Sequence, residues 1–546
     1  MNANISEILI KTIIFVENFL IKKTIILLMK KFLSLLVVLG LISGSYAQEV
    51  KMTMSETQKK VQMLHVGRIN DKNYVVTQNF KEKNYALDIY NDNLTLLQSS
   101  VFKEKGGEKS GLAGKGFDYL NTLFMKDRVL IFFTTFEKTS KQRLLICQKV
   151  DLNGKFEGDF TQIDEIQAKR KGNSGNFAVY MSEDSTQFLA LQLTPYEKNA
   201  EEEMYVTTFD SNLKKIAAKK VNLPYKDKNT RVIGARVSNN GDVFMLVNVI
   251  KERKEKTKGS DNDFFSIIGV NFSSDNSLVE YNLEMKKKNI TDAGFRIDNE
   301  NNQLLVTGFY SNIKTNAVWT NDIDGSFIMR IDIDSKKIAK ENQKDFPKEL
   351  VNQLAGRDLD KKVKAGQGIS NRFDIVNMLK RDDNSMLVVA ENRWIDAITT
   401  CTNNVCITTY VYHNRNILLI DVDADGKIKS FYDIPKRQVM NNTSFYQSFL
   451  TMQKHNEFIF VFNDNPKNID KKIINIKDVK AMNNPGKACL SFIRLSENGK
   501  LSRENVTFDK KSKITVAPKF GVRVSEGQYI MPYYKKNDFG ILKLEF

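Results

Sequence analysis

Short polar turns followed by strongly apolar segments recur along most of the chain. Eight segments carry Asn, Asp, Ser or Gly in a turn and continue into β-branched and aromatic residues, the composition of a buried strand. They occupy residues 69–78, 125–134, 182–192, 238–247, 298–308, 381–391, 453–462 and 525–534. A second polar turn follows an apolar strand seven times, at 91–96, 151–156, 210–215, 273–280, 332–337, 423–428 and 496–501. This spacing predicts a repeated unit of four strands joined by hairpin turns.

The two kinds of turn differ in number because the last repeat stops at residues 539–546, after its third strand. Residues 49–54 supply a spare strand before the first repeat. Pairing this strand into the last sheet would close a ring and remove an exposed sheet edge. Residues 48–546 therefore resemble a secreted bacterial β-propeller, an all-β fold, without the signature of a named family. The turn count favours eight four-stranded blades, with seven as the alternative.

The longest connections fall on one face of the predicted ring. Strands of a blade alternate in direction, so the two polar turns share one face. Connections between the second and third strands share the opposite face with the links between blades, and we name this the long-loop face. Its long segments are 251–264, 311–326, 345–356, 394–413 and 463–488, and a short helix is predicted within 345–356. Loops on a rigid scaffold commonly carry binding function, so we expect the binding surface here.

The N-terminus carries an export signal. In residues 29–47, Lys30 and Lys31 precede an apolar run that ends in small residues at Ala47. This pattern predicts a cleaved signal peptide and a periplasmic or extracellular protein. Residues 1–28 are interpreted as a non-native upstream extension, the alternative being an uncleaved membrane anchor. Membrane association is expected only in that second case.

Composition and charge narrow the class of partner. The 546 residues are 41% hydrophobic and 27% charged, which excludes a disordered chain. Lys and Arg number 82 against 65 Asp and Glu, a net charge of +17. For an exported protein this excess favours an envelope or extracellular protein, or a polysaccharide, over nucleic acid. The alternative is that the lysines only keep the surface soluble.

Aromatic and basic residues of the long-loop face are the candidate ligand contacts. The two tryptophans of the chain both fall in or beside long loops, and flat aromatic faces suit sugar rings and protein partners. A basic run lies in the loop 251–264. The alternative for both groups is structural: the aromatics pack the loops and the basic run is solvated. The candidate residues are Trp319, Trp394, Tyr410, Tyr412, Lys251, Arg253 and Lys254.

The four cysteines divide into two groups. Cys401 and Cys406 flank four residues at the neck of a predicted hairpin, and export makes a disulfide between them plausible. Such a bond would stiffen a loop tip and add little global stability. Cys147 and Cys489 lie in apolar strands of separate repeats and are expected to be buried free thiols.

Metal and catalytic signals are weak. Asp421, Asp423 and Asp425 alternate as in the start of a calcium loop, but Tyr432 stands where the closing Glu is expected. An ordinary hairpin turn is the alternative, and no cofactor other than this Ca²⁺ is expected. No catalytic residue stands out. We therefore predict a binding or scaffolding module that recognises an envelope protein or polysaccharide. The alternative is a glycan hydrolase or lyase using carboxylates on the same face.

Overall fold

The computed structural model describes most of the chain from residue 50 onward. The described ranges are 50–59, 61–79, 81–82, 84–103, 116–257, 263–313, 322–354, 369–370, 372–402, 405–469, 476–509 and 512–546. The predicted extension, the signal peptide and Trp319 lie outside these residues. Lys51–Glu545 form one compact unit, and the fold is that of this unit.

Antiparallel sheets dominate the described residues: six have four strands, two have five and one has two. The first two four-stranded sheets contain β2 (Gln62–Ile69), β3 (Lys72–Asn79), β4 (Asn84–Tyr90) and β5 (Leu96–Lys103), and then β6 (Asp118–Phe124), β7 (Arg128–Glu137), β8 (Gln142–Asp151) and β9 (Thr161–Gln167). The next two contain β10 (Asn176–Met181), β11 (Gln187–Leu193), β12 (Glu201–Asp210) and β13 (Lys215–Lys226), and then β14 (Thr230–Val237), β15 (Val243–Ile250), β16 (Asp263–Asn271) and β17 (Ser277–Leu283). The last two contain β18 (Lys288–Asp298), β19 (Gln303–Asn312), β21 (Gly325–Asp332) and β22 (Lys337–Asp345), and then β29 (Leu450–Lys454), β30 (Glu457–Asp464), β31 (Cys489–Leu495) and β32 (Leu501–Val506).

Two sheets of five strands complete the set. The arm sheet contains β24 (Phe373–Lys380), β25 (Met386–Thr402), β26 (Val405–Val422), β27 (Ile428–Ile434) and β28 (Gln438–Asn441). The closing sheet contains β1 (Lys51–Met54), β33 (Ile514–Val516), β34 (Val522–Ser525), β35 (Gln528–Lys535) and β36 (Asp538–Glu545). The short β20 (Asp322–Ile323) pairs with β23 (Ile369–Ser370). The helical segments are α2 (Lys348–Leu354) and the 3₁₀ turns η2 (Asp227–Asn229), η3 (Arg253–Glu255), η4 (Pro466–Asn468), η5 (Pro485–Lys487) and η6 (Pro518–Phe520).

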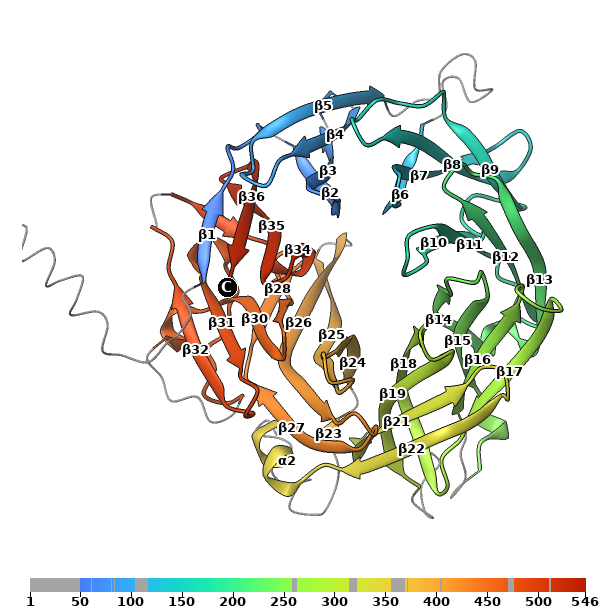
Figure 1. Cartoon of the computed structure of the whole chain (residues 1–546). Helices are drawn as coiled ribbons and strands as arrows, with labels where there is room; N and C mark the ends of the chain where they lie inside the picture. Colours follow the sequence, from blue (N-terminus) through green and yellow to red (C-terminus); the bar gives the residue numbers. More distant parts are fainter. Residues whose placement is uncertain are drawn as a thin grey trace, which may run out of the picture. The chain divides into compact units, whose positions relative to one another are not determined.

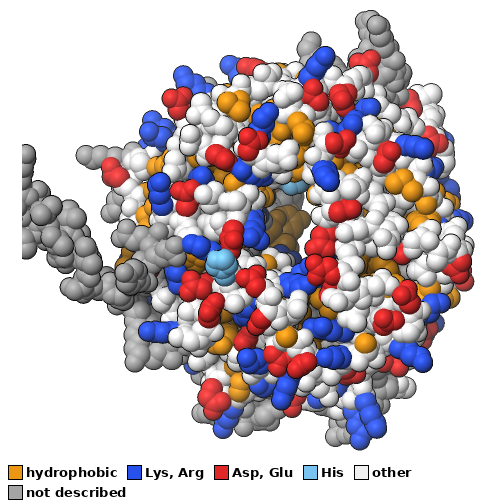
Figure 2. Space-filling view, in the orientation of Figure 1, with side chains coloured by type: hydrophobic (Ala, Val, Ile, Leu, Met, Phe, Trp, Pro, Cys, Tyr) orange, Lys and Arg blue, Asp and Glu red, His pale blue; other side chains and the backbone are white. Residues whose placement is uncertain are grey.

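The core lies between consecutive sheets, which stand around a central space (Figure 1). One buried cluster joins Val76 of β3 to Phe133 of β7, and the clusters that follow join each next pair up to the β29–β32 sheet. Another joins Val75 of β3 to Ile541 of β36, so the last sheet packs on the first. This apolar burial between neighbours is what holds the sheets in a ring. The ring is hollowed at its centre, with charged side chains around the rim (Figure 2).

The ring closes through its first strand, as the sequence predicts. β1 pairs antiparallel with β36, from Lys51 opposite Glu545 to Met54 opposite Leu542. Buried Ser55 continues the contact: its N–H donates to the Ile541 carbonyl (2.9 Å), and its Oγ accepts from the Ile541 N–H (2.9 Å). The edge of the last sheet is thereby covered.

The predicted turns and helix are also present. Gly154, Gly426 and Gly499 have φ of +82°, +82° and +78°, the left-handed conformation that glycine adopts most readily in a tight turn. The predicted helix in 345–356 is α2, which buries Leu350 and Leu354. Among the described residues, no helix has the length and apolar character needed to cross a membrane.

Candidate functional site

A long hairpin rises from the arm sheet on the long-loop face. β25 and β26 remain paired beyond the sheet, from Trp394 opposite His413 to Thr402 opposite Val405, and we call residues 394–413 the arm. The predicted hairpin is present, and its strands take up the segment 394–413 that was expected to be a long loop, because its β-branched residues extend both strands. The predicted disulfide is present: Cys401 and Cys406 are bonded directly across the hairpin, with Cα atoms 4.1 Å apart. Cys147 and Cys489 are free and buried, also as predicted.

Trp394 anchors the base of the arm. Its ring stacks on His413, with centroids 4.4 Å apart and planes within 5°. The guanidinium carbons of Arg372 and Arg415 lie 4.4 and 4.7 Å from the indole centroid. Trp394 Nε1 donates to Asp396 (3.1 Å). Neighbouring side chains therefore already contact the indole ring. The interpretation that Trp394 packs the loop fits these contacts better than the interpretation that it offers a free face to a sugar.

Positive charge is concentrated beside this stack. The buried Nε atoms of Arg415 and Arg437 have no hydrogen-bond partner among the described residues. Burial lowers the pKa of Arg415, and the neighbouring guanidinium of Arg437 lowers it further. Asp396 is the nearby acid, and its Oδ2 lies 3.0 Å from Nε2 of His413. Burial also lowers the pKa of His413, and the Asp396 carboxylate opposes this shift.

A cavity of about 690 Å³ opens between the arm base and the residues that lead into β29. Lys519 of η6 reaches it from the closing sheet and donates to the carbonyl (2.8 Å) and hydroxyl (3.3 Å) of Ser444. Burial lowers the pKa of Lys519; the charge of Glu391 opposes this shift, and the positive charge of Arg393 adds to it. Arg393 itself pairs with Asp374. Two cations thus converge on a cavity whose lining contains one carboxylate, that of Asp374.

An ion pair without solvent exposure lies beneath this cavity. Lys436 Nζ is 2.6 Å from Glu391 Oε1, and both side chains are 0% exposed. Glu391 also accepts from Asn414 Nδ2 (2.9 Å) and from Ser448 Oγ (2.8 Å). Since Asn414 and Ser448 line the cavity, this network fixes the positions of two lining residues.

A carboxylate pair that the sequence did not reveal lies on the inner strands. Asp292 of β18 follows a bulge at Thr291, and its carboxylate accepts from the backbone N–H groups of Ile375 and Ala293. Burial raises the pKa of Asp292 to about 7, and the charge of Asp374 contributes to the rise. Bulges occur in β2, β6, β14, β18, β24 and β34. In β2, β6, β14 and β24 the bulge falls on an apolar pair followed by a small or polar residue, but in β18 Thr291 interrupts this pattern, so it would not have identified Asp292.

The other predicted residues lie elsewhere or have other roles. Tyr412 lines the cavity, and Tyr410 is 48% exposed on the arm. The basic run belongs to the β14–β17 sheet, away from the arm: Lys251 follows β15 and Arg253 begins η3. Lys254 Nζ lies 3.7 Å from Glu252, whose carboxylate also contacts Lys228 (2.6 Å). This run is therefore neutralised in part by its own acid.

The predicted calcium residues do not converge. Asp421 pairs with Arg381 (2.8 Å), and Asp425 lies 3.5 Å from Lys340. Asp423 accepts from the backbone of Lys427 (2.8 Å), as in an ordinary hairpin turn. Within the described part of the chain, no three His, Cys, Asp or Glu side chains are grouped to hold a metal ion. The turn interpretation fits this geometry.

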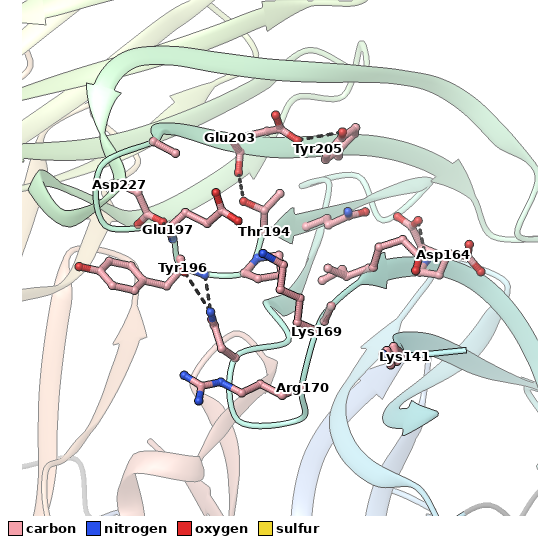
Figure 3. Close-up of a pocket in the computed structure, with 18 of the residues that line it drawn as sticks. Lys141, Asp164, Lys169, Arg170, Thr194, Tyr196, Glu197, Glu203, Tyr205 and Asp227 are labelled. Atoms are coloured by element: carbon pink, nitrogen blue, oxygen red, sulfur yellow. Dashed lines mark hydrogen bonds between the residues drawn. The ribbon is translucent and has the colours of Figure 1, made fainter. Parts of the chain in front are cut away.

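A second pocket, of about 1210 Å³, lies between the β6–β9 and β10–β13 sheets (Figure 3). Asn173 and Tyr196 fix its wall through two reciprocal 2.9 Å hydrogen bonds. Its acidic lining residues are Asp164, Glu165, Glu197, Glu201, Glu203 and Asp227, against Lys141, Lys169 and Arg170. This pocket therefore has an excess of negative charge, whereas the cavity at the arm base contains Lys519 and Arg393.

No family model matches this sequence, and no curated protein matches it. Among solved structures, the WD40 domain of SCAP from fission yeast is similar over 92% of this chain and 97% of that one, at 8% identity and a TM-score of 0.41. The β-propeller domain of the Trilobed protease from Pyrococcus furiosus is similar over 83% and 97%, at 11% identity and a TM-score of 0.33. The structural neighbours are β-propeller domains, and the closed ring of antiparallel sheets makes this chain a β-propeller protein.

Proposed function

We propose that this chain is an exported, eight-bladed propeller that binds an acidic envelope polysaccharide through the cavity at the arm base. The observation that carries the proposal is the convergence of Lys519 and Arg393 on one cavity of the long-loop face. An anion that enters the cavity would stabilise the charged, partly desolvated ammonium group of Lys519 and the neighbouring guanidinium group of Arg393. Hydroxyl groups of Ser444 and Tyr412 on the same wall suit the hydroxyls of a sugar.

Several features support an anionic ligand over a neutral one. Arg372, Arg415 and Arg437 extend the positive region around the arm base, and Asp396 offsets only part of it. Guanidinium groups bind carboxylates in bidentate geometry, and such charge-assisted bonds are stronger than neutral ones. The excess of Lys and Arg over Asp and Glu adds long-range attraction to an acidic polymer.

The test is calorimetric titration of the purified full chain with alginate, a carboxylate polysaccharide, and with its ester, in which the carboxylates are masked. We expect binding to alginate that weakens with salt, and little binding to the ester. Replacing Lys519→Met removes a charge-assisted contact of ~1.5–3 kcal/mol and should raise Kd about tenfold or more. Lys519→Arg should retain most of the affinity.

Lys254→Met is the matched control, because it removes one lysine charge from a different sheet. It should leave Kd unchanged. Equal losses in Lys519→Met and Lys254→Met would show attraction by net charge rather than a site. Equal binding of alginate and its ester would reject recognition of the carboxylate, and binding only to acidic envelope proteins would replace the polysaccharide with a protein partner.

A specific observation favours glycan hydrolysis or lysis as a second candidate function. Glycosidases use one protonated and one ionised carboxyl group, and Asp292 with its pKa near 7 beside Asp374 has that character. Incubation with alginate should then release new chain ends, and Asp292→Asn should abolish their release while Kd is kept. Binding without cleavage by the unmodified chain would reject this candidate.

A further inference from the structure

Three arginines are grouped beside the Trp394 ring at the base of the arm, and we call Arg372, Arg415 and Arg437 the arginine row. The guanidinium carbons of Arg372 and Arg415 lie 4.4 and 4.7 Å from the indole centroid. The pairing of β28 with β26 places Arg437, just before β28, beside Arg415. Burial lowers the pKa of Arg415, and the charges of Arg437 and Arg372 lower it further, so the three cations lie close enough to repel one another.

The guanidinium groups of the row have no partner within the described part of the chain. None of them donates a hydrogen bond or forms an ion pair there, whereas Arg68, Arg381 and Arg494 each pair with a carboxylate. Of the nitrogens of the row, only Nε of Arg415 and of Arg437 is buried without a partner. The terminal N–H groups therefore remain accessible to a ligand. Guanidinium groups are well suited to bind carboxylates and phosphates through paired N–H groups.

The charges around the row do not balance. Asp396 is the carboxylate whose charge acts on Arg415, and its Oδ2 also lies 3.0 Å from Nε2 of His413. Three guanidinium groups against this one carboxylate leave an excess of two positive charges. Nearby, Arg393 pairs with Asp374 and so adds no net charge. An anion with two negative charges would match the excess.

We propose that the arginine row binds the phosphomonoester group of a phosphorylated sugar. Such a group carries about −1.5 to −2 charges near pH 7 and has three acceptor oxygens, enough for several guanidinium groups at once. A carboxylate has one charge and two oxygens, so it would leave part of the positive charge unmatched. The inference deepens the proposed function and rests on it for the saccharide. Trp394 and His413 line the cavity and lie against the row, so one glycan can reach both places.

Calorimetric titration of the purified full chain with small sugars tests the proposal. Glucose 6-phosphate, glucose 6-sulfate and glucuronate carry different anionic groups at the same end of a similar sugar. We expect the Kd for glucose 6-phosphate to be lower than for the other two by about tenfold or more, because the dianion forms additional charge-assisted contacts.

Substitutions locate the binding to the row. Arg372 is exposed, so Arg372→Gln should fold normally and raise the Kd for glucose 6-phosphate by about tenfold. Arg415→Lys keeps the charge but loses the paired N–H groups, so the Kd should rise by a smaller factor. The matched control is Arg231→Gln on β14, because Arg231 is also exposed and removes one charge from another sheet. It should leave the Kd unchanged.

The pH dependence distinguishes a phosphate dianion from other anions. A phosphomonoester loses its second charge below about pH 6. Between about pH 7 and pH 5, binding of glucose 6-phosphate should therefore weaken about tenfold relative to glucose 6-sulfate, which remains a monoanion. Comparing the two sugars cancels any change that comes from His413, Asp396 or Lys519.

The outcomes separate this inference from the proposed function. Equal affinity for glucose 6-phosphate and glucose 6-sulfate would overturn the inference, and so would equal losses in Arg372→Gln and Arg231→Gln. Binding of alginate without binding of glucose 6-phosphate would overturn it and leave the proposed function standing. Binding of glucose 6-phosphate that depends on Arg372, without binding of alginate, would support the phosphate site and reject recognition of the carboxylate polymer. Inorganic phosphate binding as tightly as glucose 6-phosphate would overturn the assignment to a sugar.

Discussion

The buried pair of Lys436 and Glu391 should be among the most sensitive positions in the ring. Lys436→Met keeps a similar side-chain length but leaves the Glu391 carboxylate without its cation. The carboxylate has no solvent exposure and retains only the Asn414 and Ser448 hydrogen bonds. Removing one partner of such a pair costs ~3–5 kcal/mol of the free energy of unfolding.

This cost converts into a measurable shift of the unfolding temperature. Unfolding entropy is about 2.1 cal/mol/K per residue, so the unit Lys51–Glu545 has roughly 1 kcal/mol/K, and Tm should fall by about 3–5 °C. Differential scanning calorimetry at pH 7 measures Tm, and urea denaturation gives the free energy of unfolding independently.

Two comparisons make this prediction refutable. Lys220→Met removes a lysine that is 45% exposed and 2.5 Å from Glu203, and an exposed pair of this kind contributes only ~0–1 kcal/mol. Lys436→Met combined with Glu391→Leu removes both charges and should recover much of the stability. If Lys436→Met costs no more than Lys220→Met, the interpretation of the pair as a desolvated ion pair is wrong.

Three further perturbations have defined outcomes. The pKa of Asp292 is raised to about 7, so ionisation of this carboxyl group destabilises the folded state. The free energy of unfolding should therefore fall as the pH rises from about 4 to 7. Urea denaturation should measure this decrease in the unmodified chain and not in Asp292→Asn. Ser55→Ala leaves the buried N–H of Ile541 without its acceptor and should lower the free energy of unfolding by ~1–3 kcal/mol in the same assay. Replacing Cys401 and Cys406 by Ser should speed proteolysis within the arm while calorimetry shows Tm of the ring unchanged, because the bond closes only a short local loop.

The sheets could be predicted because each depends on local sequence. The turn at Gly426 needs a residue tolerant of positive φ, and apolar runs such as 386–390 mark strands buried on both faces. The closing role of residues 49–54 followed from counting turns. A hairpin was predicted around Cys401 and Cys406, but the length of its strands was not, although the threonines of this segment are β-branched and suit a strand.

The site could not be predicted because it depends on contacts between distant residues. Asp292 and Asp374 belong to different sheets, and Lys519 reaches Ser444 from the closing sheet. Trp394 was identified as important from its rarity and position. The stacking of His413 on its ring follows from strand register, which hydrophobic pattern alone does not determine.

The pairing of β1 with β36 also determines the order in which the molecule can be completed. Its contacts join residues separated by almost the whole chain, so this pairing has the largest loop-closure cost in the fold. During synthesis, β1 is made before its partner and stays unpaired until β36 has been synthesised. A chain that loses β36 therefore leaves β1 with no strand to pair with, and Val75 of the first sheet loses its contact with Ile541. The ring can therefore close only after β36 has been synthesised, and a chain without β36 has an open ring.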